Sequence, residues 1–226
     1  NTTFALNERR IVTAFEPVVD VRSRQPAFYE CLVRMEQADG RALLAPDIVP
    51  VAERLGLIRL VDHRVLELAV AELAASPNVR LSLNISPATT MDPDWWTSIE
   101  SLMQAHPGAG ERLIVEITET VAIQDIDDIR GFITRLKNFG SQIAIDDFGA
   151  GYTSFRNLRK LGVDIVKIDG AFVQNLRRSD DDRTFVHTMI DLARRLGLQT
   201  VAEWVQDEEA AAMLALSNLD SPGDEN

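Results

Sequence analysis

The stretch Gln142-Ile143-Ala144-Ile145-Asp146-Asp147 decides the fold class. Its apolar residues are typical of a buried β-strand, and the strand ends in two carboxylates. The run Leu113-Ile114-Val115-Glu116-Ile117-Thr118 has the same form and lies about 30 residues earlier, the length of one strand–helix–strand unit. Between them, Asp125 to Asn138 opens on acidic residues and is followed by Gly140, which is typical of a helix. This alternation predicts an α/β fold with parallel strands.

Seven strands are predicted along the chain, with helical patterns between most of them. The first two are joined only by Asp20 to Pro26, too short for a helical crossover, so this pair should be antiparallel. The predicted strands are Val12–Val19, Ala27–Arg34, Arg80–Ile85, Leu113–Thr118, Gln142–Asp146, Ile165–Ile168 and Thr200–Glu203. The other predicted helices are Pro46 to Arg59, Asp62 to Ala75 and Asp181 to Leu196.

This order fits a modified (β/α)₈ barrel of the TIM type in which the eighth strand is missing. Such barrels usually need about 250 residues, and this chain has 226. The last stretch, Leu216 to Asn226, is rich in Ser, Asp, Pro and Gly and is predicted to be a polar tail. Because the chain starts at Asn1 rather than Met, we expect a fragment of a larger protein.

Composition excludes several classes of function. A net charge of −12 repels a phosphate backbone, so bulk nucleic-acid binding is not expected. The sequence lacks an apolar run of about 18 residues, so we expect no membrane contact by this domain. One Cys and three His cannot build a common zinc site, so any metal would be held by carboxylates, which favours Mg²⁺ or Mn²⁺.

Polar residues occur near the carboxyl ends of six predicted strands, where barrel enzymes carry their chemistry. Five carboxylates in one small mouth must either be partly protonated or be held by cations, and one or two divalent ions are the simpler account. Two such ions would suit in-line displacement at phosphorus. Taken singly, each residue has an ordinary structural interpretation, such as an ion-pair partner or a turn residue. The set is Glu30, Asn84, Glu116, Asp146, Asp147, Lys167 and Glu203.

At these positions the sequence resembles the EAL domain family of cyclic di-GMP phosphodiesterases, over about residues 10 to 215. The matching motifs are Glu30-Cys31-Leu32-Val33-Arg34, Asn84-Ile85-Ser86, Glu116-Ile117-Thr118-Glu119, Asp146-Asp147-Phe148-Gly149-Ala150-Gly151-Tyr152-Thr153-Ser154, Lys167-Ile168-Asp169 and Ala202-Glu203-Trp204-Val205-Gln206. The resemblance implies one barrel domain across residues 1–226, with one antiparallel strand, that opens cyclic di-GMP to linear pGpG.

The resemblance also implies roles for individual residues. Catalytic roles fall to Lys167, which would orient the attacking water, and to Glu203 and Asp147. Substrate would be bound by Arg34, Glu30 and Leu32. Glu119 would stabilise the loop after Asp147. One or two Mg²⁺ or Mn²⁺ ions would be bound by Glu30, Asn84, Glu116, Asp146, Asp147 and Glu203.

Several positions depart from the family pattern and keep other functions open. The usual Gln of the first strand is Glu16, and the Gly and second Glu of the last motif are Trp204 and Gln206. The alternatives are therefore a cyclic di-GMP receptor without hydrolysis, or an inert dimerisation scaffold. From the family we also expect a homodimer, formed through the region after Asp147, and a cytoplasmic domain whose full-length protein could be tethered to a membrane.

Overall fold

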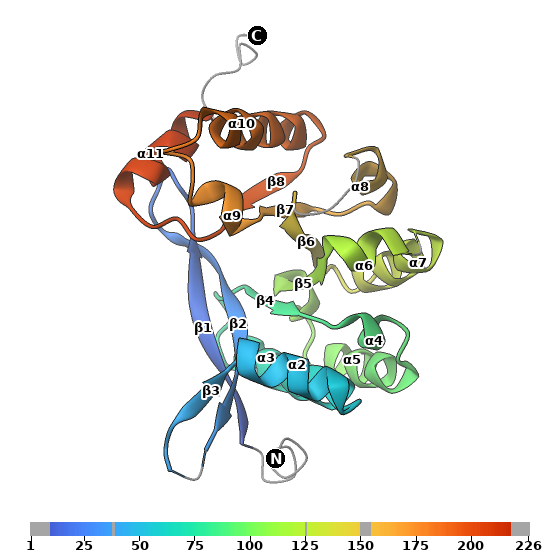
Figure 1. Ribbon diagram of the computed structural model, residues 1–226. Coiled ribbons are helices and arrows are strands. Elements are labelled where there is room, and N and C mark those ends of the chain that lie inside the picture. The colour runs from blue at the N-terminus through green and yellow to red at the C-terminus, as the bar shows by residue number, and fades with distance from the viewer. Residues whose placement is uncertain (1–9, 38, 125, 150–154, 218–226) are drawn as a thin grey trace. The chain divides into compact units, whose positions relative to one another are not determined.

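The computed structural model describes residues 10–37, 39–124, 126–149 and 155–217 (Figure 1). The chain divides into two compact units. The first comprises residues 1–18, 26–117 and 134–142, and the second comprises residues 19–25, 118–133 and 143–226. Each unit combines strands with helices, so the predicted α/β class is confirmed.

The first unit is built on parallel strands with a short antiparallel addition. Strand β2 (Pro26–Glu36) pairs in parallel with β4 (Leu81–Asn84), which pairs in parallel with β5 (Leu113–Thr118). Strand β3 (Ala42–Leu44), which was not predicted, pairs antiparallel with β2. The helices are α2 (Ala45–Arg54), α3 (Ile58–Ala75), α4 (Pro87–Thr90), α5 (Pro93–Ala105) and a 3₁₀ turn at Gly110–Arg112.

Strand β1 (Ile11–Val19) neighbours β2, and the expected antiparallel pairing is found. The N–H of Glu36, at the end of β2, donates to the carbonyl of Arg10 just before β1, at 2.9 Å. The connection after β1 is closed by the N–H of Asp20, which donates to the carbonyl of Gln25 at 2.9 Å. A six-residue connection leaves no room for a crossover helix, which explains this direction.

The second unit carries three parallel strands, β6 (Gln142–Phe148), β7 (Ile165–Ile168) and β8 (Gln199–Ala202). Helix α7 and strand β6 each have residues in both units, because the boundaries between the units fall within them. Among described residues, only one helix follows β8, so no eighth barrel strand is found there. The helices are α6 (Glu119–Gln124), α7 (Ile126–Lys137), α8 (Phe155–Leu161), α9 (Gly170–Val173), α10 (Asp180–Arg195) and α11 (Glu208–Ser217).

Two predicted boundaries were wrong. The helix expected from Pro46 to Arg59 ends at Arg54, and a new helix begins at Ile58. Gly56 lies between them with φ +68°, a left-handed conformation that glycine adopts without steric cost and that ends a helix. At the other end, Leu216 and Ser217 belong to α11 rather than to a polar tail, and residues 218–226 lie outside the described part of the chain.

Helix α3 shows why the first unit holds together. Its buried residues recur every three or four positions and include Val61, Val65, Leu66, Ala69 and Leu73. This spacing places one apolar stripe on the core. No helix in the described ranges is both long enough and apolar enough to cross a membrane.

We predict that Leu66→Ala lowers the free energy of unfolding by about 2–5 kcal/mol, because it leaves a cavity in the core. Leu66 is 0% exposed. The matched control is Leu60→Ala on the same helix, whose side chain is 51% exposed and should change stability little. Urea denaturation measures both variants, and equal losses would contradict the assignment of this stripe to the core.

Candidate active site

A β-bulge brings two carboxylates to the end of β6. The pairing of β6 with β7 matches Ile145 with Val166 and Phe148 with Ile168, so two residues on β6 oppose one on β7. Those two are Asp146 and Asp147. Strict alternation would turn neighbouring side chains to opposite faces of the sheet, and a bulge re-aims one of them. At this bulge the backbone of Asp147 has a left-handed conformation with φ +53°. The N–H of Asp147 donates to Oδ1 of Asp146 at 3.0 Å.

Lys167 on β7 is the buried cation of this cluster. Its side chain is only 2% exposed. Its Nζ lies 3.0 Å from Oδ1 of Asp146 and 3.0 Å from Oε1 of Glu203, which directly follows β8. A buried charge is tolerated where ion pairs and hydrogen bonds replace its lost hydration. One ammonium thus connects the carboxyl ends of three adjacent strands.

Three carboxylates of this cluster could share a metal ion. Asp146, Asp147 and Glu203 each offer an oxygen, and these oxygens lie within 4.8 Å of one another. Opposite ligands of octahedral Mg²⁺ at 2.1 Å lie about 4.2 Å apart, so small side-chain movements would suffice. An all-oxygen donor set is the chemistry that Mg²⁺ and Mn²⁺ prefer.

Desolvation, together with nearby negative charge, shifts the pKa of Asp147. Its pKa is raised above the usual value, first by desolvation and then by the charges of Asp146 and Asp169, while Lys167 opposes the shift. An acid with a raised pKa holds its proton more tightly in the folded protein than in the unfolded chain. Its ionised form therefore destabilises the metal-free fold at neutral pH.

The backbone that follows the bulge is held by Glu119, at the start of α6. This buried side chain, only 3% exposed, accepts a hydrogen bond from the N–H of Gly149 at 3.1 Å. The contact has the form expected for a residue that stabilises this loop. The rest of the motif, Ala150 to Ser154, lies outside the described residues.

In the other unit, a second group of polar residues lies within β2, β4 and β5. The side-chain amide of Asn84 donates to Oε1 of Glu30 at 2.9 Å. Asn84 is paired in register with Glu116, which is fully buried, and the N–H of Ile85 donates to the Glu116 carbonyl at 3.1 Å. Strand pairing thus brings together the three expected metal ligands of this unit.

Alternation along β2 places the three residues that are predicted to bind substrate, Glu30, Leu32 and Arg34, on one half-buried face. The Arg34 guanidinium donates to the carbonyl of Val33 at 3.0 Å. Cys31 occupies the opposite face and is 3% exposed. Burial, reinforced by Glu116 and Glu30, raises the pKa of the Cys31 thiol to about 12, so this residue fills space rather than acting as a nucleophile.

Three of the positions that depart from the family pattern, Glu16, Trp204 and Gln206, are exposed, whereas Cys31, which replaces the signature Ala, is buried. Glu16 lies on β1, and Gln206 lies between β8 and α11. Trp204 has φ +53° and a side chain that is 61% exposed, in contact with Gly170. Neither the bulge nor this contact was predicted, since both depend on residues far apart in the sequence.

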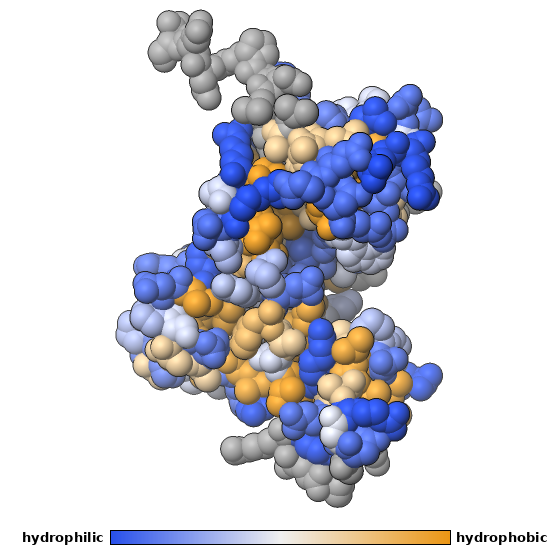
Figure 2. Space-filling view, turned by 90° about the vertical axis from the view of Figure 1, so that its left-hand side faces the viewer, coloured by the Kyte–Doolittle hydropathy of each residue, from blue (hydrophilic) through white to orange (hydrophobic). Residues whose placement is uncertain are grey.

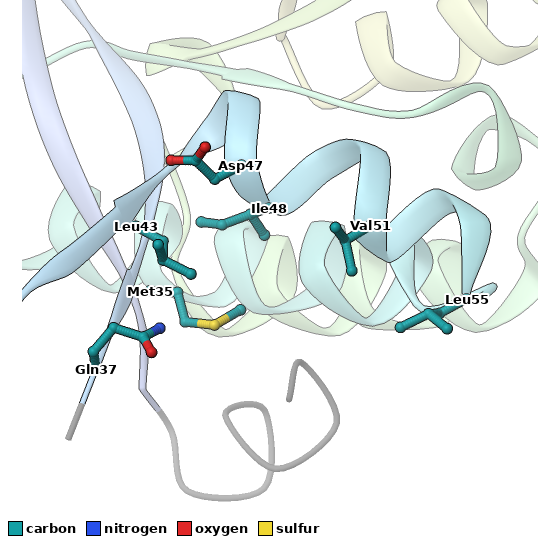
Figure 3. A pocket seen from close by; sticks show the side chains of 7 residues that line it. All are labelled: Met35, Gln37, Leu43, Asp47, Ile48, Val51 and Leu55. Atoms are coloured by element: carbon teal, nitrogen blue, oxygen red, sulfur yellow. The ribbon is translucent and has the colours of Figure 1, made fainter.

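A hollow of about 360 Å³ in the first unit lies beside α2 rather than at the strand ends described above (Figure 3). Apolar side chains of β2, β3 and α2 line it, together with Gln37 and Asp47. Hydrophobic and hydrophilic residues are interspersed on the face shown in Figure 2. The hollow holds one carboxylate and no cluster of titratable groups, so it is a packing feature without evident chemistry.

The fold and cluster define an α/β protein whose acidic residues and lysine gather at the carboxyl ends of parallel strands. The sequence model of the EAL domain matches residues 3–221, and the chain belongs to that family. Its structure resembles that of the PaMucR phosphodiesterase solved as a c-di-GMP complex, with a TM-score of 0.89, 28% identity, and coverage of 96% of this chain and 90% of that one. The TIM-barrel-like fold of EAL domains is thereby confirmed.

Relatives in sequence carry matching names. The cyclic di-GMP phosphodiesterase PdeF of Escherichia coli is 30% identical over 91% of this chain and 28% of its own length. The cyclic di-GMP phosphodiesterase PdeB of Shewanella oneidensis is 31% identical over 91% of this chain and 24% of its own length. The chain therefore spans about a quarter of the length of these relatives.

We predict that Asp147→Asn stabilises the metal-free protein at neutral pH. The amide carries no charge, and Asn tolerates a positive φ as well as Asp does. The pKa of this carboxyl in the unfolded chain is near 3.8, so the desolvated and repelled charge destabilises the fold above that pH, and the effect disappears as the pH falls. The advantage of the variant in thermal unfolding with EDTA should thus shrink toward pH 4 or below.

Glu53→Gln, a carboxyl-to-amide change at an exposed site on α2, is the control and should show little of this pH dependence. Added Mg²⁺ should reverse the order, because the wild type gains stability from the ion and the variant loses a ligand. A stability advantage that is unchanged across the pH range would show that the charge of Asp147 is not the cause.

Proposed function

We propose that this domain hydrolyses cyclic di-GMP to linear pGpG in a reaction that needs a divalent metal. The observation that carries the proposal is the Asp146–Asp147–Glu203 oxygen cluster with the buried Lys167 beside it. Two relatives named cyclic di-GMP phosphodiesterases and a structural neighbour solved with c-di-GMP support the substrate.

The ligands of Mg²⁺ or Mn²⁺ are proposed to include Asp146, Asp147 and Glu203, whose oxygens already lie close together. Glu30, Asn84 and Glu116 are proposed as further ligands, in keeping with the family motifs. A bound ion would lower the pKa of a water molecule and neutralise charge on the phosphoryl oxygens.

The protein's own groups would do the positioning. Lys167, fixed by two carboxylates, is proposed to orient the attacking water, because a buried ammonium has few alternative positions. Arg34 is proposed to contact a substrate phosphate, where a guanidinium gives two parallel hydrogen bonds. Leu32, on the same face of β2, would supply apolar contact, and Glu119 would fix the backbone after the bulge.

Further properties of the protein follow as proposals from the family. We propose a homodimer, formed through the region after Asp147, and a cytoplasmic location for this domain. The resemblance to the family supports the dimer. In that family, the loop that follows the position of Asp147 couples subunit contact to metal binding.

The direct test is incubation with cyclic di-GMP and Mg²⁺ or Mn²⁺, followed by measurement of both pGpG and bound ligand. Metal-dependent pGpG formation supports the proposal, and EDTA should abolish it. Binding without pGpG would identify a receptor instead, and neither binding nor turnover would identify a scaffold.

We predict that Asp146→Asn lowers kcat at least about 100-fold while the protein stays folded, because charge is lost where the metal and Lys167 meet. Arg34→Ala should mainly raise KM, since it removes a charged hydrogen bond worth about 1.5–3 kcal/mol. Circular dichroism and gel filtration serve as folding controls. Unchanged turnover in folded Asp146→Asn would remove this residue from the site.

A further inference from the structure

Three features of Trp204 are unusual for a tryptophan that only fills space. Its backbone has φ +53°, which is unusual for a bulky aromatic residue. Its side chain is 61% exposed, although an indole contributes most when it is buried. It also directly follows Glu203, the partner of Lys167. Residues with strained backbone cluster at functional sites, so a role of Trp204 in binding is a reasonable hypothesis.

One side of the indole is fixed in place by Gly170. A Cβ atom on Gly170 would lie 2.3 Å from the indole Cδ2 and 2.5 Å from Cγ and Cε3, so the ring occupies the space that a side chain would fill. Gly170 begins α9, directly after Asp169, which caps that helix by accepting from the N–H of Ala171 at 2.8 Å. The ring is therefore held against rigid backbone near the end of β7.

The indole also borders a polar groove of about 450 Å³ in the second unit. Arg177 crosses it, with ion pairs to Asp207 at 2.8 Å and Glu209 at 2.9 Å that hold the start of α11. Gln174, Arg178 and Gln206 also line this groove. An aromatic face beside amide and guanidinium groups suits a flat ligand with polar edges.

We propose that Trp204 is a specificity-determining residue whose exposed indole stacks on one guanine base of cyclic di-GMP. The proposal rests on the function proposed above and adds the group that recognises the base. Base–aromatic stacking contributes about 1–3 kcal/mol per base. Guanine also presents O6 and N7 acceptors, which a guanidinium such as that of Arg178 can contact. A Gly at this position, as in the family motif, offers no such surface.

The test compares Trp204→Leu with Trp204→Phe in steady-state hydrolysis of cyclic di-GMP with Mg²⁺. Loss of stacking in Trp204→Leu should raise KM about 5- to 150-fold, with kcat nearly unchanged. Trp204→Phe keeps a π face and should recover most of the affinity. Gly170→Ala, which displaces the ring without changing it, should raise KM in the same direction. Phe15→Leu, an aromatic-to-aliphatic change at a side chain 40% exposed on β1, is the control and should leave KM unchanged.

Tryptophan fluorescence gives a second readout that does not depend on turnover. Of the three Trp residues, Trp95 and Trp96 are 0% and 7% exposed, so ligand quenching should come from Trp204 and vanish in Trp204→Leu. Wild-type hydrolysis with an unchanged KM in folded Trp204→Leu would overturn the stacking proposal alone. Quenching without pGpG formation would support stacking and overturn the enzymatic function. Neither quenching nor hydrolysis in the wild type would overturn both.

Discussion

The buried ion pair network of Lys167 is the constraint on which the second unit depends. The Lys167 side chain is 2% exposed, so its ammonium has lost most of its hydration, and the nearby carboxylates of Asp146 and Glu203 compensate for that loss. These partners come from the ends of β6 and β8, on either side of β7. Placement of the three strand ends is therefore fixed by electrostatics as well as by backbone pairing. A divalent ion bound as proposed would meet ligands that these contacts already orient.

Much of this arrangement follows from the period of a β-strand. Alternation along β2 separates Glu30, Leu32 and Arg34 from Cys31, because side chains on successive residues point to opposite faces. All seven predicted strands are present, since each combines apolar residues with a clear boundary. The antiparallel start also followed from the length of a connection, which is a simple geometric limit.

Other features are set by contacts between distant residues. The same alternation predicts opposite faces for Asp146 and Asp147, and only the pairing with β7 produces the bulge that changes this. Strand β3 has three exposed residues and exists because β2 offers it a partner. The contact of Trp204 with Gly170 joins segments that follow two different strands, so the local sequence of neither segment predicts it. The helix break at Gly56 was missed because the apolar pattern continues on both sides of the glycine.

The bulge requires two residues between Ile145 and Phe148, and this requirement on length is separate from the requirement on which residues they are. Deleting one residue there would restore regular pairing with β7 and leave a single carboxylate opposite Lys167. An insertion of one residue would move Phe148, the last residue of β6, to the opposite face of the sheet and break its match with Ile168. A change in length here therefore alters the strand pairing itself, whereas a substitution alters one side chain. In comparisons among family members, a gap in the alignment at this point would be as strong a sign of lost chemistry as the replacement of Asp146 itself.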